Sequence, residues 1–127
     1  MSLAHAGWRA TKEIRLKKDE LEKVMINSEG SQRLLTFRWT LYQNERLVVF
    51  RTFDGIVAQH ILAKNHHNQS FRIKLASTVP KSLKIPFILI KFKVFDHEKN
   101  EALFELMLRD DDEMFVLKYL NEEDVNE

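Results

Sequence analysis

Four consecutive acids, Asp110 to Glu113, stand between two runs of large apolar side chains near the end of the chain. Carboxylate oxygens are the ligands that calcium prefers, and they are also the usual acids and bases of metal-dependent hydrolysis. Neighbouring side chains on extended or turning backbone diverge, so only Asp110 and Asp112 could share an ion. Asp96, in the other acidic turn, is the one obvious further ligand.

The spacing of these acids does not match a calcium loop, which needs alternating carboxylates and a glycine at its sharp bend. Asp is common in turns, and charged turns keep the edge of a sheet soluble. We therefore interpret 110–113 as the tip of a hairpin. A calcium site or a metal-dependent enzyme built on the acidic turns is the third of three functional hypotheses.

Other catalytic chemistry finds little support in the residue types present. The chain has no cysteine, and its five histidines, at positions 5, 60, 66, 67 and 97, lack the spacing of a zinc site. There is no G-x-S-x-G around a nucleophilic serine, and no glycine-rich loop for a nucleotide phosphate. We expect a non-enzymatic protein without a cofactor.

Basic residues interleaved with aromatic ones are the more informative pattern. Six of them occupy what we interpret as the polar phase of alternating segments: Arg38, Arg51, Arg72, Lys74, Lys91 and Lys93. If the segments pair in register, these residues form one basic sheet face, which is what binding of a nucleic-acid backbone requires. The rings nearby in sequence fall mostly on the opposite, apolar phase. Nucleic-acid binding is therefore the second hypothesis.

The first hypothesis is a protein–protein interaction or assembly module, because catalytic motifs are missing while strands with charged outer faces offer edges for pairing. The partner would be another protein or a second copy of the chain. One candidate contact region is the edge near Pro80 to Pro86. The candidate contact residues are Trp8, Tyr42 and Phe53, expected to be exposed, together with Arg38, Arg51, Lys91 and Lys93.

Length and composition are those of one globular domain over residues 1–127, with 44% apolar and 31% charged residues. The net charge of +1 conceals an uneven distribution. Residues 1–95 carry 17 basic and 7 acidic side chains, whereas residues 96–127 carry 3 and 12. We interpret the split chiefly as solvated faces that meet in the fold, the alternatives being a basic surface for an acidic partner or an acidic tail that competes for that surface.

Periodicity predicts mainly strands. Around residues 19–27, Asp19 could cap a helix with Glu22 three residues on, and Leu21, Val24 and Met25 fall on one helical face, so a short helix is expected there. From Arg33 onward the period is two. Three strands with turns at 42–45 and 54–55 form a first meander, and the segments 87–95, 101–108 and 113–120 form a second.

The segment 77–86 contains both prolines, which remove ladder donors, so we expect the chain to change sheets there. The resulting prediction is an antiparallel β-sandwich of seven or eight strands with one short N-terminal helix. An immunoglobulin-like topology is possible on strand count alone, without the Cys and Trp spacing of that family.

No apolar run approaches the length that spans a bilayer, so no membrane insertion is expected within this chain. Residues 1–10 and 121–127 are expected to fray. Residues 1–3 could be an expression leader on a trimmed chain, in which case a signal or anchor preceded it. The sequence therefore assigns no cellular compartment.

Overall fold

The computed structural model describes residues 8–64, 68–76 and 85–123. Over these residues the chain forms strands and one helical turn. Their bounds are β1 Ala10–Lys17, β2 Glu22–Ser28, β3 Ser31–Gln43, β4 Arg46–Phe53, β5 Ile56–Ala63, β6 Ser70–Lys74, β7 Phe87–Asp96, β8 Glu101–Arg109, β9 Val116–Tyr119 and α1 Leu120–Glu123.

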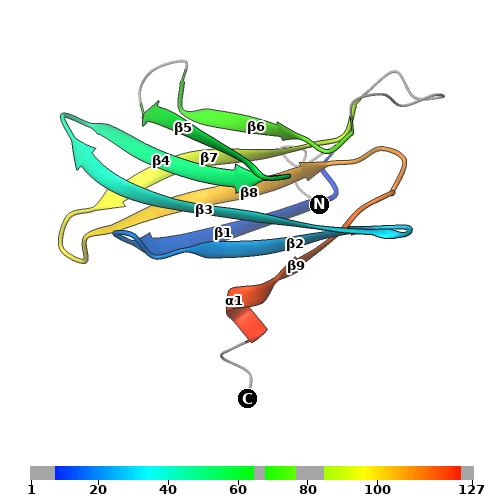
Figure 1. The fold of residues 1–127 in the computed structure, drawn as a ribbon. Helices are drawn as coiled ribbons and strands as arrows, with labels where there is room; N and C mark the ends of the chain where they lie inside the picture. The colour runs from blue at the N-terminus through cyan, green and yellow to red at the C-terminus, as the bar shows by residue number, and fades with distance from the viewer. Residues whose placement is uncertain (1–7, 65–67, 77–84, 124–127) are drawn as a thin grey trace.

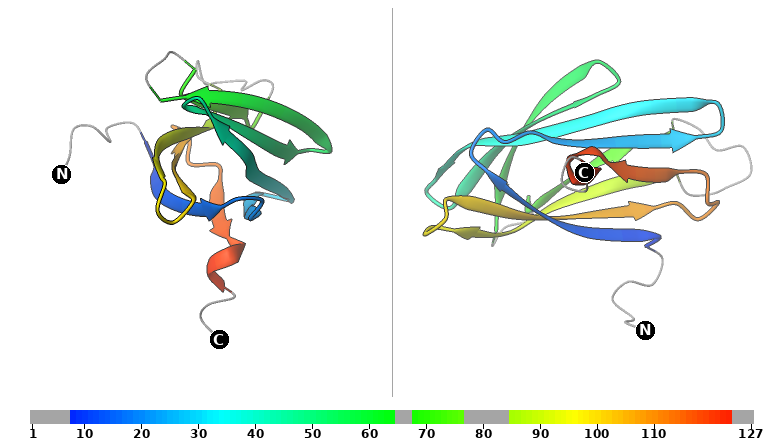
Figure 2. Two further views of the ribbon diagram at one scale, coloured as in Figure 1. Left: turned by 90° about the vertical axis from the view of Figure 1, so that its left-hand side faces the viewer. Right: turned by 90° about the horizontal axis from the view of Figure 1, so that it is seen from below.

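The strands form two antiparallel sheets that face each other (Figures 1 and 2). One has four strands in the order β1-β8-β7-β6, and the other has five in the order β5-β4-β3-β2-β9. The predicted antiparallel sandwich is confirmed, with nine strands in the described residues rather than seven or eight. The order differs from that of immunoglobulin domains, so the immunoglobulin-like alternative has no support.

One continuous apolar core fills the space between the sheets. From Leu35 to Trp39 every second residue of β3 points inward, and Leu35, Phe37 and Trp39 are at most 2% exposed. The ring of Phe37 meets that of Phe104 from the opposite sheet edge-to-face, with 5.4 Å between centroids. The Trp39 indole donates a 2.7 Å hydrogen bond to the carbonyl of Leu16, which joins the two sheets directly.

The expected helix at 19–27 is wrong, because this segment contains strand β2. Glu22, Val24 and Ile26 alternate inward, and the strand lies between β3 and β9. The apolar residues fit a period of two as well as a helical one, and pairing with two neighbours satisfies the backbone of β2 on both sides. Asp19 caps no helix; it adopts a φ of 64° in the turn that precedes the strand.

The first predicted meander is confirmed by the order β3, β4, β5 and by the positive φ angles at the two turns, residues 44–45 and 54–55. The second is half right. Strands β7 and β8 form a hairpin, but β9 crosses to the other sheet and pairs with β2. The acids 110–113 are therefore part of a connection between sheets, not the tip of a hairpin.

The predicted sheet change at 77–86 is also wrong. Residues 77–84 lie outside the described residues, but β6 and β7 on either side of them pair with each other. The chain instead changes sheets between β5 and β6, over residues 64–69. A proline-bearing segment needs only an interruption of the ladder, which a loop within one sheet provides equally well.

Regular structure begins at Ala10 and ends at Glu123 in the described residues. Ala10 already pairs with Leu108, and Asn121 in α1 donates a 2.9 Å hydrogen bond to the carbonyl of Leu21. Residues 1–3, the possible leader, lie outside the described residues. None of the helical structure in the described part of the chain is long and apolar enough to span a membrane.

Candidate functional site

Asp110, the first of the predicted metal ligands, is fully buried and organises the β8–β9 connection. Its carboxylate accepts a 2.7 Å hydrogen bond from the backbone N–H of Phe115 and lies 3.1 Å from the Arg9 guanidinium. Its carbonyl accepts a hydrogen bond from the N–H of Glu113, which has a φ of 54°. These contacts assign to Asp110 a structural role in closing the loop.

The other two predicted ligands do not join it. Asp112 is exposed. Asp96 lies at the opposite end of β8, where its carboxylate accepts hydrogen bonds of 3.0 and 3.1 Å from the backbone N–H groups of Glu98 and Lys99. Within the described residues no three His, Asp or Glu side chains gather as a metal site would require.

The six predicted basic residues do not form one face. Four of them, Arg72, Lys74, Lys91 and Lys93, lie on the outer face of the four-stranded sheet along β6 and β7. Arg38 is exposed on the other sheet, 3.9 Å from Asp19. The sequence could not reveal this division, because the strand period fixes a face within one sheet and not which sheet a strand joins.

Arg51, the sixth, belongs to the inner phase of β4, opposite the buried Phe37. Apolar residues occupy both alternating sets of positions in β4, so the sequence did not reveal whether Arg51 points inward or outward. The Arg51 guanidinium donates a 3.3 Å hydrogen bond to Nε2 of His60, whose ring stacks on Phe71 with centroids 4.1 Å apart. Burial, and then the charge of Arg51, lower the pKa of His60.

The three candidate aromatic contacts differ in exposure. The expected exposure of Phe53 is wrong: it is 5% exposed and lies beneath the Arg33 guanidinium, which also pairs with Asp54 at 3.1 Å. Trp8 is half-buried on the outer face of the four-stranded sheet, edge-to-face with Phe87 at 5.8 Å.

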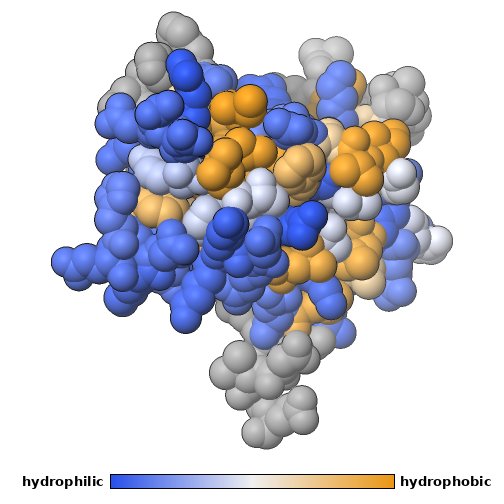
Figure 3. Space-filling view, turned by 60° about the vertical axis from the view of Figure 1, so that its left-hand side comes forward, coloured by the Kyte–Doolittle hydropathy of each residue, from blue (hydrophilic) through white to orange (hydrophobic). Residues whose placement is uncertain are grey.

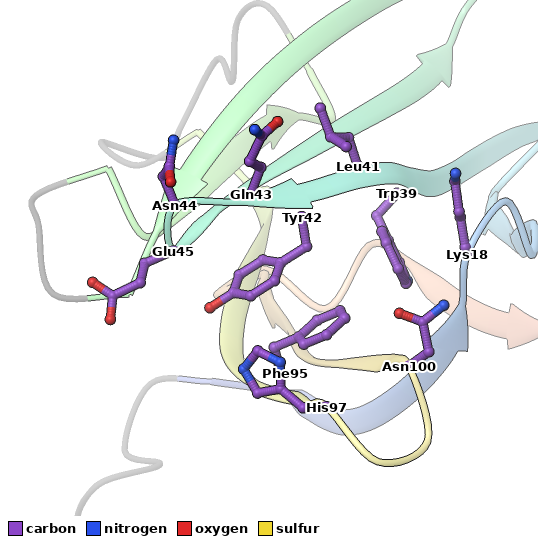
Figure 4. Close-up of a pocket in the computed structure, with 10 residues that line it drawn as sticks. All are labelled: Lys18, Trp39, Leu41, Tyr42, Gln43, Asn44, Glu45, Phe95, His97 and Asn100. Atoms are coloured by element: carbon purple, nitrogen blue, oxygen red, sulfur yellow. The ribbon is translucent and has the colours of Figure 1, made fainter.

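Tyr42 is half-buried at one end of the sandwich, in a hollow of about 590 Å³ between the β3–β4 and β7–β8 turns (Figure 4). Its ring stacks on Phe95 at 4.1 Å, and Phe95 in turn meets Trp39 edge-to-face. Burial, and then Glu45, raise the pKa of the Tyr42 hydroxyl. These rings contact one another, so we assign them to closing this end of the core.

Strand β5 lies at an edge of its sheet, and part of that edge has backbone groups without a partner in the described part of the chain. The far half of the edge is occupied by Asn68, which accepts from the N–H of Ala63 at 3.3 Å and donates its side-chain amide to the carbonyl of Ile61 at 2.9 Å. Successive residues of a strand point their backbone groups to opposite sides, and β5 pairs with β4 without a bulge. Val57 and Gln59 therefore point their N–H and C=O outward, as Ile61 and Ala63 do.

No backbone bond outside the sheet ladders reaches Val57 or Gln59 anywhere in the described residues. The reason is geometric: the β4–β5 hairpin reaches away from the four-stranded sheet at its tip (Figure 2, left). The same separation of the hairpin tip from the four-stranded sheet leaves Ile56 uncovered. It shares its face with the buried Leu62, yet it is 64% exposed.

Strand β5 also differs from the other edge strands in charge. Its eight residues, IVAQHILA, include no Lys, Arg, Asp or Glu. The other three edges carry charges, at Lys12, Glu13, Arg15 and Lys17 on β1, at Arg72 and Lys74 on β6, and at Lys118 on β9. Charges on an edge normally prevent it from pairing with another chain. The β5 edge lacks that protection.

The outer surface beside this edge is apolar as well. Leu41, Val48 and Ile61 form a row across β3, β4 and β5, and Leu41 and Ile61 are 47% and 46% exposed. Figure 3 shows hydrophobic side chains gathered across the middle and right of the view, interrupted by polar ones. We refer to β5 from Ile56 to His60, together with this row, as the β5 edge site.

Sequence reasoning missed this site, although part of its signal was visible. An eight-residue strand without charges, next to the turn Asp54-Gly55, is legible in the sequence. What the sequence did not reveal is that β5 lies at an edge.

A scan against protein-family models, a search of curated proteins and a search of solved structures gave no match to this chain.

Proposed function

We propose that this protein is a non-enzymatic protein–protein interaction module, which holds an extended segment of another chain as an added strand along the β5 edge site. The observation that carries the proposal is the pair of outward-facing residues, Val57 and Gln59, on an uncharged edge, whose backbone groups have no partner among the residues that the structure describes. Strand addition uses such groups for affinity, and it uses pockets beside them for specificity.

The surroundings suit an apolar, extended partner segment. The outer side chains of an added strand would lie beside Val57 and Gln59, one position along β5 from the apolar row that ends at Ile61, and its inner side chains would cover Ile56. Burying apolar surface contributes about 25 cal/mol per Å², so these side chains add to the backbone hydrogen bonds. The partner segment is expected to alternate apolar residues and to contain little charge.

Selection from a displayed library of random peptides tests the proposal. We expect the enriched peptides to share an alternating apolar pattern and to slow exchange of the Val57 and Gln59 amide protons. Val57→Pro removes one outward donor without removing a bond to β4, and Val57→Lys places a charge on the edge. Both variants are expected to lower peptide affinity at least tenfold.

Val116→Lys is the matched control, because Val116 is 65% exposed on β9 and Val57 is 67% exposed on β5. This control should bind selected peptides like the wild type. Absence of any enriched pattern would refute strand addition at β5. So would peptides that bind both Val57 variants as tightly as the wild type.

A second candidate function, binding of nucleic acid, is favoured by the four basic residues on β6 and β7. Arg72 and Lys74 are exposed there, and the Arg72 guanidinium stacks 4.5 Å from the Phe87 ring. Binding through these residues should weaken steeply with salt, because condensed counterions are released. Lys74→Glu with Lys91→Glu should abolish it, whereas Arg38→Glu on the other sheet should not. A labelled oligonucleotide that remains unshifted at low salt removes this candidate.

A further inference from the structure

We infer that a second copy of this chain is itself an occupant of the β5 edge site, with the two β5 strands antiparallel about a twofold axis at Ala58. This inference rests on the proposed function and names one partner for it. Two properties of the described residues lead to it: the absence of charge on β5, and the position at which Asn68 ends the free edge.

Charge decides whether an edge can pair with itself. In a twofold pairing the same strand meets its own copy, so most charges on it would face like charges nearby. The edges formed by β6 and β9 carry only basic charges, which would repel their copies, and β1 carries three basic residues against one acid. Only His60 on β5 can acquire charge, and burial together with Arg51 lowers its pKa. Self-pairing of β5 is therefore free of repulsion near neutral pH.

The backbone groups decide the register. In an antiparallel pair, residues that point toward the neighbouring strand lie opposite one another and exchange two hydrogen bonds. With the axis at Ala58, Val57 of each copy lies opposite Gln59 of the other. The pairing then uses all four outward groups that Val57 and Gln59 offer in each copy, and it leaves both hydrogen bonds of Asn68 intact.

The neighbouring register is excluded by Asn68. If the axis lay at Gln59, Val57 would have to exchange hydrogen bonds with Ile61 of the second copy. The Ile61 carbonyl already accepts from the Asn68 side chain at 2.9 Å on that side. Moving the axis to Val57 instead would place Gln59 opposite Gly55, which belongs to the turn and has a φ of 76°. Ala58 is the position that satisfies both limits.

Side chains fit the same register. The two copies approach most closely at the axis. Ala58 stands there, and its side chain is the smallest in the segment 56–60. Ile56 lies opposite His60 of the second copy, so its exposed side chain gains an apolar contact on the inner face. Val57, the most exposed apolar residue of β5 at 67%, lies beside Gln59 of the second copy on the outer face.

The contact is small, so the dimer is expected to be concentration-dependent. Interfaces well below about 1,200 Å² are characteristic of transient complexes. Sedimentation from about 10 μM to 1 mM, where weak association becomes visible, should show a rise toward twice the 15.1 kDa of the chain. Val57→Lys should remain monomeric over that range, and Val116→Lys should dimerise like the wild type.

Single cysteines in this cysteine-free chain test the register. Opposed residues in a non-hydrogen-bonded pair have Cα atoms about 4.5 Å apart, within the range that a disulfide bridges. Ala58→Cys should therefore form a covalent dimer under mild oxidation. Three other variants should cross-link at least tenfold more slowly. In Gln59→Cys and Val57→Cys the cysteine is displaced by two residues from its own copy, and in Val116→Cys it lies on a distant strand.

Equal cross-linking of all four variants would overturn the inference, as would a monomer at every concentration. Faster cross-linking of Gln59→Cys than of Ala58→Cys would overturn it by showing a different axis. These outcomes are separable from failure of the proposed function. A monomeric chain whose β5 edge still binds selected peptides refutes the self-pairing alone.

Discussion

Asp110 shows how one carboxylate in an acidic run can differ from its neighbours. Its side chain is 1% exposed, whereas that of Asp111 is 38% exposed. Desolvating a carboxylate is costly unless hydrogen bonds and a counter-charge compensate, and here Phe115 and Arg9 supply them at one of the two oxygens, Oδ2. Sequence alone made Asp110 and Asp112 equal candidates for a shared ion; burial assigned Asp110 to the structure of the loop.

Replacing Asp110 by alanine tests that assignment. The buried N–H of Phe115 would lose its acceptor, and Arg9 would keep only the Phe115 carbonyl and Glu113. A buried polar group left without a partner costs about 1–3 kcal/mol. We expect the free energy of unfolding of Asp110→Ala to fall by that amount in chemical denaturation. Asp112→Ala, on an exposed neighbour, should unfold like the wild type. Equal losses in the two variants would contradict the structural role.

His60 provides a pH-dependent prediction. Because its pKa is lowered in the folded state, the unfolded chain binds more protons as pH falls through the ordinary histidine value near 6.5. Stability should therefore decrease between about pH 7.5 and 5 by more in the wild type than in His60→Gln. Thermal unfolding across that range measures the difference. Parallel curves for the two proteins would show that His60 does not contribute.

At the scale of elements, β2 and β5 illustrate what periodicity can predict. Strand character was predictable for β3 from its alternation and for β4 and β5 from the turns at 44–45 and 54–55 that delimit them. For β2 the apolar residues fitted two periods, and pairing with β3 and β9 decided between them. Edge position was not predictable for β5, because it depends on which strands lie beside it and not on its own residues.

Two proline substitutions test the direction of the β5 backbone groups. The N–H of Ala58 points toward β4, and that of Val57 points away. Ala58→Pro should therefore lower the free energy of unfolding by considerably more than Val57→Pro, because it removes a ladder bond and leaves a β4 acceptor unpaired. Chemical denaturation of both variants measures this. A larger loss of stability in Val57→Pro than in Ala58→Pro would contradict the account, because it would mean that the Val57 N–H is the one bonded to β4.

At the scale of the whole molecule, the two-sheet architecture was predictable from strand number and turn spacing, but the assignment of strands to sheets was not. Strand β9 illustrates the reason: its four residues, VLKY, could follow β8 as a hairpin, yet they pair with β2. Such contacts between distant segments are decided by core packing. The basic residues were divided between the sheets for the same reason, so the predicted basic face was only partly formed.

The uneven charge along the chain is partly resolved within the fold. Arg9 pairs with Asp110 and Glu113, and Lys93 lies 3.6 Å from Glu105. These ion pairs join the basic first three-quarters of the chain to the acidic last quarter. They support the interpretation of the charge split as faces that meet in the fold.

Residue-resolved amide hydrogen exchange along β5, at low and high protein concentration and with a selected peptide, tests the account most directly. At low concentration the Val57 and Gln59 amides should exchange rapidly, whereas those of Ala58 and His60, bonded to β4, should exchange slowly. High concentration or peptide should slow Val57 and Gln59 alone. Slow exchange of Val57 and Gln59 in the dilute protein, or rapid exchange under every condition, would contradict an edge that accepts another strand.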